Sequence, residues 1–155
     1  MLNKDDLRIM IADVLKRLGM YSETATELLM GTCAVESDFG RSVEQVGGGP
    51  GLGVFQMEPN TMNDIWYNYI RYREGLRVIL ADEFGMRGPD KERLKNDVEY
   101  GIVMARLKYR RSPLVLPNSA SNIEGLARVW KKVYNTDLGK GTVEKFVSKY
   151  KKYCV

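Results

Sequence analysis

The sequence predicts an all-α fold, a single helical domain over residues 1–155 with at most a small β-hairpin element. Apolar residues recur with helical spacing in several segments, and stretches rich in glycine or proline separate those segments. A length of 155 residues suits one hydrophobic core, and 44% hydrophobic with 28% charged residues is ordinary for a globular protein. The longest apolar runs are only a few residues, so no membrane-spanning helix is expected.

The first two helices are expected in the N-terminal part of the chain. Two acids, Asp5 and Asp6, suit a helix N-terminus, and Gly19 ends the apolar pattern that follows them. A second helix is expected to start at Thr24, where Glu27 would complete a capping box. This helix should end near residue 40.

A change of character over residues 41–60 predicts a loop. Glycines crowd its centre, and no Lys-Ser or Lys-Thr follows them, which argues against a phosphate-binding loop. The stretch leads into Val54, Phe55 and Gln56, an apolar setting that is unusual for a simple solvent loop. We therefore expect a loop with a small hairpin, in which glycine allows close backbone approach.

Four further signals place the remaining helices. Thr61 resembles the cap of a helix whose pattern continues to Phe84, and a second pattern covers residues 90–110. Asn122 is expected to cap the next helix, and the last helix should start near Thr142. The resulting prediction is a chain of helices joined by short polar connections.

Histidine is absent, and this excludes several chemistries. No Ser-His or Cys-His nucleophile pair can form, and zinc sites that contain histidine are excluded. Acid–base work must therefore fall to carboxylates, lysine or tyrosine. The two cysteines, Cys33 and Cys154, are expected to be reduced and partly buried, although a disulfide stays possible at this stage.

A net charge of +4 and a pI near 9.0 favour polyanionic surroundings without choosing among nucleic acid, anionic lipid and cell wall. The basic run Arg106–Arg111 is too short to favour a nucleic-acid-binding domain. Several late lysines are most simply a solvated helix face, and contact with an anionic wall or membrane is the sharper alternative. These lysines are Lys140, Lys145, Lys149, Lys151 and Lys152.

Glu36 is the most informative residue of the sequence. Its spacing from Leu29 and Cys33 places it on the same helix face, which should point inward. Burial disfavours the charged form of a carboxylate, so the pKa of Glu36 should rise. A raised pKa suits a group that donates a proton near neutral pH. The alternative is a half-exposed glutamate at a helix end.

Aromatic residues after the loop have two interpretations. Trp66, Tyr67, Tyr69 and Tyr72 could stack on sugar rings. Residues 66, 69 and 70 also share a helix face, which is the usual pattern of a core. We place Trp66 in the core and leave Tyr67 open.

Several short motifs occur in order along the chain. They are Glu36-Ser37, Gly51-Leu52-Gly53-Val54-Phe55-Gln56, Pro59 with Thr61, Gly101 within a helix, and Tyr134-Asn135. Together they resemble the signature of the soluble lytic transglycosylase and goose-type lysozyme superfamily, in which Glu-Ser precedes Gly-Leu-x-Gln, Pro-x-Thr and Tyr-Asn. This chain inserts an additional Gly-Val before Phe55-Gln56. The resemblance covers residues 24 to 136, and the short, unsignalled chain resembles a phage-encoded member.

The resemblance implies roles for five residues. Glu36 would be the catalytic acid, and Ser37 would help orient groups around it. Gln56 would line the substrate cleft, while Tyr134 would approach the catalytic carboxyl and hydrogen-bond in the site. Asn135 would fix the local turn. Tyr134 could instead belong to the core, because its neighbours Trp130 and Val133 are apolar.

The resemblance also implies a lysozyme-like fold and an activity. The chain is expected to cleave the β-1,4 bond between N-acetylmuramic acid and N-acetylglucosamine in peptidoglycan, with Glu36 protonating the leaving oxygen. No metal and no organic cofactor is expected. A second carboxylate or the N-acetyl group of the substrate would stabilise the oxocarbenium-like transition state.

The second carboxylate decides between two reactions. Glu58 lies two residues after Gln56, where goose-type lysozymes carry an acid, and it could activate water for hydrolysis. Glu44, eight residues after Glu36, is a second candidate. The alternative is that both acids are exposed loop carboxylates, and this alternative is favoured for Glu44. Hydrolysis is the favoured expectation, and a lytic transglycosylase that forms 1,6-anhydro ends is the alternative.

A rival from another class is an inactive wall-binding or structural module that keeps the fold. The expected partner is bacterial peptidoglycan, with no nucleic acid, possible transient contact with anionic membrane or wall, and a monomeric state. The N-terminus lacks a basic and apolar signal peptide. A phage lysis or wall-penetration enzyme would then start in the host cytoplasm or be carried by the virion.

Overall fold

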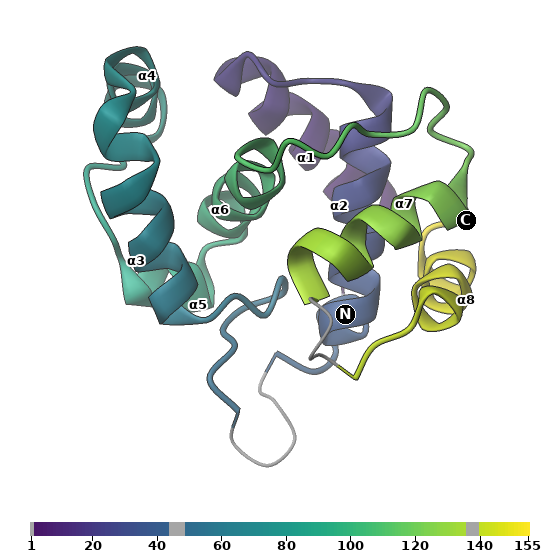
Figure 1. Cartoon of the computed structure of the whole chain (residues 1–155). Coiled ribbons are helices and arrows are strands. Elements are labelled where there is room, and N and C mark those ends of the chain that lie inside the picture. The colour runs from purple at the N-terminus through teal and green to yellow at the C-terminus, as the bar shows by residue number, and fades with distance from the viewer. Residues whose placement is uncertain (1, 44–48, 136–139) are drawn as a thin grey trace.

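The computed structural model describes residues 2–43, 49–135 and 140–155. In these ranges the chain is helical and contains no strand (Figure 1). The elements are α1 (Lys4–Leu18), α2 (Glu23–Ser37), α3 (Pro59–Asn68), η1 (Ile70–Tyr72), α4 (Glu74–Phe84), α5 (Lys91–Asn96), α6 (Val98–Arg110), α7 (Ile123–Val129), η2 (Trp130–Asn135) and α8 (Val143–Tyr153). The predicted all-α class is confirmed.

Helix α2 lies at the centre of one half of the molecule, where it contacts α1, α6, α7 and α8. Figure 1 shows α3, α4 and α5 on the other side, with α6 between the two groups. Helices α2 and α8 pack tightly at Gly31, where an added Cβ atom would lie 2.2 Å from Cζ of Phe146. This glycine lets the ring of Phe146 reach the backbone of α2, close to the end that carries Glu36.

The predicted start and end of the second helix are both wrong by a few residues. Ser22 is the N-cap, and its side chain accepts a hydrogen bond from the backbone of Ala25. Glu27 forms no capping box, because its carboxylate pairs with Arg8 instead. At the other end, the backbone turns to positive φ from Asp38 through Gly40, so the helix stops at Ser37.

Two predicted long helices are each broken in the structure. The first starts at Pro59, not after a Thr61 cap, since proline suits the first helical turn. It is interrupted by η1 before α4 begins. The second divides at Asp97, whose side chain accepts a hydrogen bond from the backbone of Tyr100 and so starts α6 anew.

The predicted hairpin is reduced to a tight turn with a single antiparallel bridge between Leu52 and Met57. Gly53 has φ +72, and a Cβ atom there would lie 2.4 Å from the carbonyl oxygen of Leu94. Phe55 packs on Gly101, where an added Cβ would lie 3.0 Å from the ring. The mid-helix glycine therefore lets the turn rest directly on α6.

The last two helices begin as predicted. The side chains of Asn122 and Thr142 accept hydrogen bonds from the backbone of Gly125 and Lys145. After α7 the chain continues through η2, which is wound as a π-helix. Such a widened turn often marks a functional segment.

The buried apolar residues form one continuous cluster drawn from every region of the described chain. Cys33 and Cys154 lie within it as free thiols, in agreement with the sequence prediction. Trp66 is buried as expected, and its indole donates a hydrogen bond to Tyr100. Tyr67, in contrast, is 56% exposed. Within the described ranges, no helix combines the length and the apolar character needed to cross a membrane.

Candidate functional site

Glu36 lies in the last turn of α2, half-buried against η2. The indole Nε1 of Trp130 donates a hydrogen bond of 3.0 Å to Oε2 of Glu36. Trp130 is 1% exposed and packs against Phe146, with ring centroids 5.6 Å apart. The carboxyl group is thus held in a fixed position by a residue that the core itself immobilises.

The pKa of Glu36 is raised from 4.5 to about 7, as the inward helix face predicts. Burial is the main cause, because it disfavours the carboxylate form. The hydrogen bond from Trp130 and the charges of Lys108 and Lys145 act in the opposite direction. Glu36 therefore keeps its proton up to neutral pH. Once the proton leaves, Trp130, Lys108 and Lys145 stabilise the Glu36 carboxylate.

Lys108, on α6, is a further site residue that, like Trp130, could not be predicted from the sequence pattern. Its ammonium group donates a hydrogen bond of 3.2 Å to the carbonyl oxygen of Tyr134 and lies 4.3 Å from the centre of the Tyr134 ring. Burial lowers the pKa of Lys108, and the negative charges of Glu36 and Glu58 oppose that shift. Lys108 therefore interacts electrostatically with both Glu36 and Glu58.

Tyr134 lines the interior of the site, but it forms a different bond from the one expected. Its hydroxyl donates to the carbonyl oxygen of Phe55 at 2.7 Å, and so fixes the turn instead of bonding the acid. The ring stacks on Tyr109 at 5.4 Å, and Tyr109 shares a 2.8 Å hydrogen bond with Thr32. Burial and then the charge of Glu36 raise the pKa of Tyr134, which keeps the phenol neutral.

Ser37 is fully buried, and its hydroxyl group forms several hydrogen bonds next to the acid. Its hydroxyl oxygen lies within hydrogen-bond distance of the carbonyl oxygens of Val54, at 2.6 Å, and Cys33, at 3.1 Å. The same oxygen accepts from the backbone of Gly40 at 2.9 Å. Ser37 therefore ties the end of α2 to the turn after it, and its role is positioning, not contact with a substrate.

Gln56 is buried at φ +49 inside the turn. Its amide nitrogen donates to the carbonyl oxygens of Val43, at 2.6 Å, and Gly53, at 2.8 Å. These bonds hold the turn together from within. At the other edge of the site, Asn135 accepts a hydrogen bond of 2.8 Å from Lys131 and ends η2.

Of the two candidates for a second catalytic carboxylate, Glu58 and Glu44, the structure describes only Glu58. Glu58 is exposed at the N-cap position of α3, and its side chain makes no capping hydrogen bond. Its position next to Lys108 brings it into the same electrostatic environment as Glu36. Glu44 lies outside the described residues.

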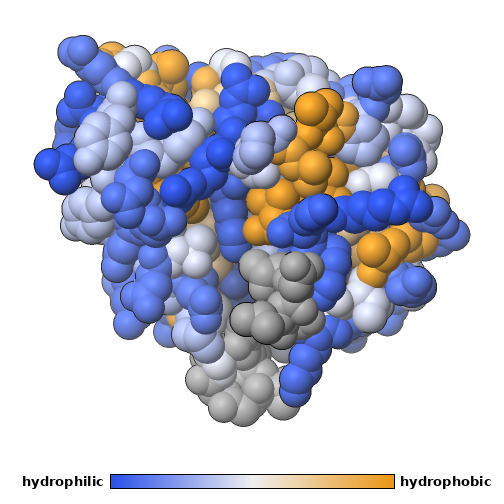
Figure 2. Space-filling view, in the orientation of Figure 1, coloured by the Kyte–Doolittle hydropathy of each residue, from blue (hydrophilic) through white to orange (hydrophobic). Residues whose placement is uncertain are grey.

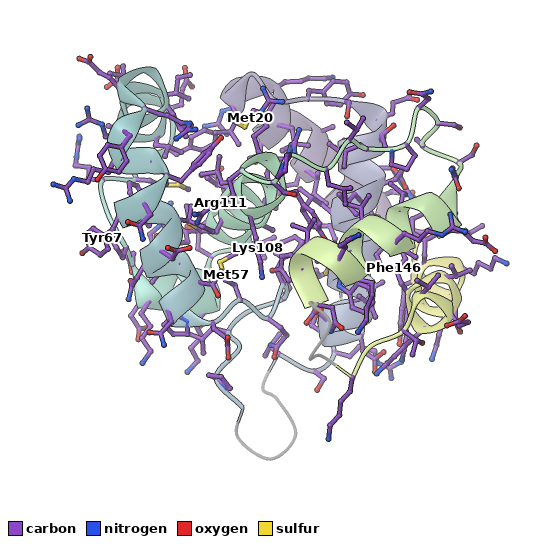
Figure 3. The ribbon with its side chains drawn as sticks, viewed as in Figure 1. Met20, Met57, Tyr67, Lys108, Arg111 and Phe146 are labelled. Atoms are coloured by element: carbon purple, nitrogen blue, oxygen red, sulfur yellow. The ribbon has the colours of Figure 1, made fainter. Side chains whose placement is uncertain are left out.

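A cavity of about 600 Å³ opens beside Lys108, between α3, the end of α6, the loop that follows and η2. Its lining contains Lys108, Arg111 and Lys132 as cations and Asp64 as the one acid among the described lining residues. Asp64 is already paired with Arg111 at 2.6 Å. Figure 3 places Lys108 on α6 and Arg111 just after the end of this helix, in the space between α3 and the α7–η2 segment. The cavity is therefore basic. Lys108, which lines it, also interacts electrostatically with Glu36.

The entrance to this region combines charged and apolar surface. Figure 2 shows a mostly hydrophilic face with hydrophobic residues gathered right of its centre, where the loop after α6 crosses the molecule in Figure 1. Leu114 and Val115 in this loop are 39% and 83% exposed. An apolar rim beside a basic floor suits a ligand with both apolar faces and negative groups.

No cluster of three or more cysteine, aspartate or glutamate side chains that could hold a metal ion occurs in the described part of the chain. Comparisons with protein families, with curated proteins and with solved structures found no match to this chain.

Proposed function

We propose that this protein is a lysozyme-like glycosidase that cleaves the β-1,4 bond between N-acetylmuramic acid and N-acetylglucosamine in peptidoglycan. The observation that carries the proposal is the half-buried Glu36 carboxyl group, which has a pKa near 7 and is held by Trp130. It interacts electrostatically with Lys108, and Lys108 lines a basic cavity. Cleavage of a glycosidic bond requires such an acid next to the leaving oxygen. The Glu-Ser, Gly-Leu, Pro-x-Thr and Tyr-Asn motifs support the same assignment, including a lysozyme-like fold.

In the proposed reaction, neutral Glu36 gives its proton to the glycosidic oxygen as the bond to the sugar carbon breaks. Glu36 becomes a carboxylate, and the Trp130 indole together with the positive charge of Lys108 stabilises it. Positive charge that develops on the sugar is met by a carboxylate or by the N-acetyl group of the substrate. Glu58, exposed beside Lys108, is the candidate that would direct water to the sugar.

The basic cavity supports peptidoglycan over a neutral polysaccharide. The peptides attached to muramic acid carry carboxylates, and Lys108 and Lys132 line the cavity without a salt-bridge partner among the described residues. Opposite charges increase both the encounter rate and the local concentration of such a substrate. A role in phage lysis or wall penetration is part of the same proposal.

The test is digestion of purified peptidoglycan by the wild type, followed by mass analysis of the released fragments. Hydrolysis leaves reducing muramic acid ends, while transglycosylation leaves 1,6-anhydro ends that are lighter by one water. We expect reducing ends from the wild type and their loss in Glu58→Gln. Anhydro ends from the wild type, with full activity in Glu58→Gln, would favour the transglycosylase alternative. Absence of any released fragment would favour the inactive wall-binding module.

A further inference from the structure

A second cavity, about 480 Å³ in volume, lies between the turn that joins α1 to α2 and the loop that follows α6. Arg106 and Arg110 line it, together with the hydroxyl groups of Tyr21, Ser22 and Ser112. The described residues that line it include no aspartate and no glutamate. The cavity therefore offers positive charge and hydrogen-bond donors without an acid of the protein to balance them.

Arg106 is the unusual residue of this cavity, because it is only 7% exposed. Its Nε donates to the carbonyl oxygen of Met20 at 3.2 Å, and the described residues supply neither a further hydrogen bond nor a carboxylate partner. Burial, with the charge of Arg110 as a second cause, lowers the pKa of Arg106 to about 10. It is still a cation at neutral pH, and buried cations are rare unless they are paired.

The neighbours of Arg106 in the cavity add a further positive charge and further hydrogen-bond donors. Arg110 lies one helical turn further along α6, and like charges at this spacing repel each other. Ser22 and Ser112 accept hydrogen bonds from the backbone of Ala25, at 2.9 Å, and Leu114, at 3.2 Å. Each hydroxyl proton can still be donated into the cavity. An anion between the two arginines would turn the repulsion into attraction and occupy these donors.

We propose that this cavity is a binding site for a small oxyanion, a phosphate or carboxylate group held by Arg106 and Arg110. A guanidinium group presents paired N–H donors that match two oxygens of either group. Phosphate and carboxylate share this chemistry, and the test below separates them. The site differs from the cavity beside Lys108, and its occupation does not depend on Glu36 or on glycosidase activity.

The test is isothermal titration of the full chain with inorganic phosphate and, separately, with succinate, at constant ionic strength adjusted with sodium chloride. Binding of either anion in a one-to-one ratio is the expected result, and the stronger of the two identifies the preferred oxyanion. Arg106→Met, which removes the charge but keeps an apolar chain in the core, should weaken binding by at least about tenfold.

Two exposed arginines complete the design. Arg110→Gln changes a surface residue of the cavity and should weaken binding several-fold without affecting folding. Arg71→Gln removes an equally exposed arginine that lies outside this cavity, and should leave binding unchanged. The proposal is overturned if neither anion binds, or if folded Arg106→Met binds as the wild type does. If Arg106→Met does not fold, unchanged binding in Arg110→Gln overturns it.

Discussion

The indole of Trp130 and the carboxyl group of Glu36, 94 positions apart in the chain, are joined by a hydrogen bond of 3.0 Å. This bond defines the geometry of the proposed acid, since the indole N–H can only donate and Glu36 must offer an oxygen to it. The second oxygen of the carboxyl group is then the one that carries the proton.

Trp130→Phe should raise the pKa of Glu36 above its wild-type value of about 7, because the indole hydrogen bond lowers that pKa. The alkaline limb of the pH–activity profile should therefore move to higher pH while the maximal rate falls, as the Glu36 anion loses a stabilising partner. Trp66→Phe is the matched control, since it removes a buried indole hydrogen bond to Tyr100 without touching Glu36. An identical alkaline limb in wild type and Trp130→Phe would contradict the assignment.

Lys108→Met should also raise the pKa of Glu36, since the positive charge of Lys108 favours the carboxylate form. The readout is the titration of the Glu36 side-chain carboxyl carbon, followed by NMR. Lys132→Met provides the control: this exposed lysine lines the same cavity, but it is not among the charges that shift the pKa of Glu36. If both variants shift the titration equally, the effect of Lys108 is only that of the general charge of the cavity.

Glu36 should make the protein less stable as pH rises. The folded pKa of about 7 lies above the ordinary value of 4.5, so the folded state binds more protons between these values and unfolding releases them. The stability contribution is complete below pH 4.5 and is lost as pH rises to about 7. One pKa unit corresponds to about 1.4 kcal/mol, so the loss is at most about 3.5 kcal/mol.

Glu36→Gln isolates this effect, because glutamine has nearly the same shape and does not titrate. The free energy of unfolding, measured with urea from about pH 4 to about pH 8, should fall less with pH in the variant than in the wild type. A constant difference between the two proteins over this range would show that Glu36 does not titrate with a raised pKa.

Tyr134→Phe should reduce stability, which the sequence alone did not predict. The resemblance predicted that the Tyr134 hydroxyl approaches the acid, whereas in the structure it donates a hydrogen bond to the buried carbonyl oxygen of Phe55. Leaving that oxygen without a partner costs about 1–3 kcal/mol. Chemical denaturation measures the loss, and Tyr67→Phe, at an exposed tyrosine, is the control. Equal stability of the two variants would show that the hydrogen bond from Tyr134 to Phe55 does not stabilise the fold.

Local patterns predicted much of the fold. The apolar spacing identified the helical segments, and short-range caps at Asn122 and Thr142 marked two helix starts correctly. The breaks at Asp97 and at η1 were not predicted, because apolar spacing continues across them while the backbone does not. A polar residue within an apolar pattern, such as Asp97, was the available signal for the first break.

The candidate site was predicted only in part, for a related reason. The inward face of α2 placed Glu36 correctly, since residues within one helix have fixed relative positions. Trp130 and Lys108 reach Glu36 through packing between helices that are distant in sequence, and periodicity carries no information about such contacts. Ser37 and Tyr134 lie near the acid, and Gln56 lies within the turn of residues 51–57. The hydrogen bonds of all three hold that turn in place.

The central claim is that Glu36 is the proton donor, and the most direct measurement is wall lysis by Glu36→Gln. The variant and the wild type are compared on purified peptidoglycan at equal concentration, with circular dichroism and thermal melting as measures of folding. We expect a folded variant that releases no fragments above background, because a carboxamide cannot donate the proton. A folded Glu36→Gln that lyses wall at the wild-type rate would contradict this claim.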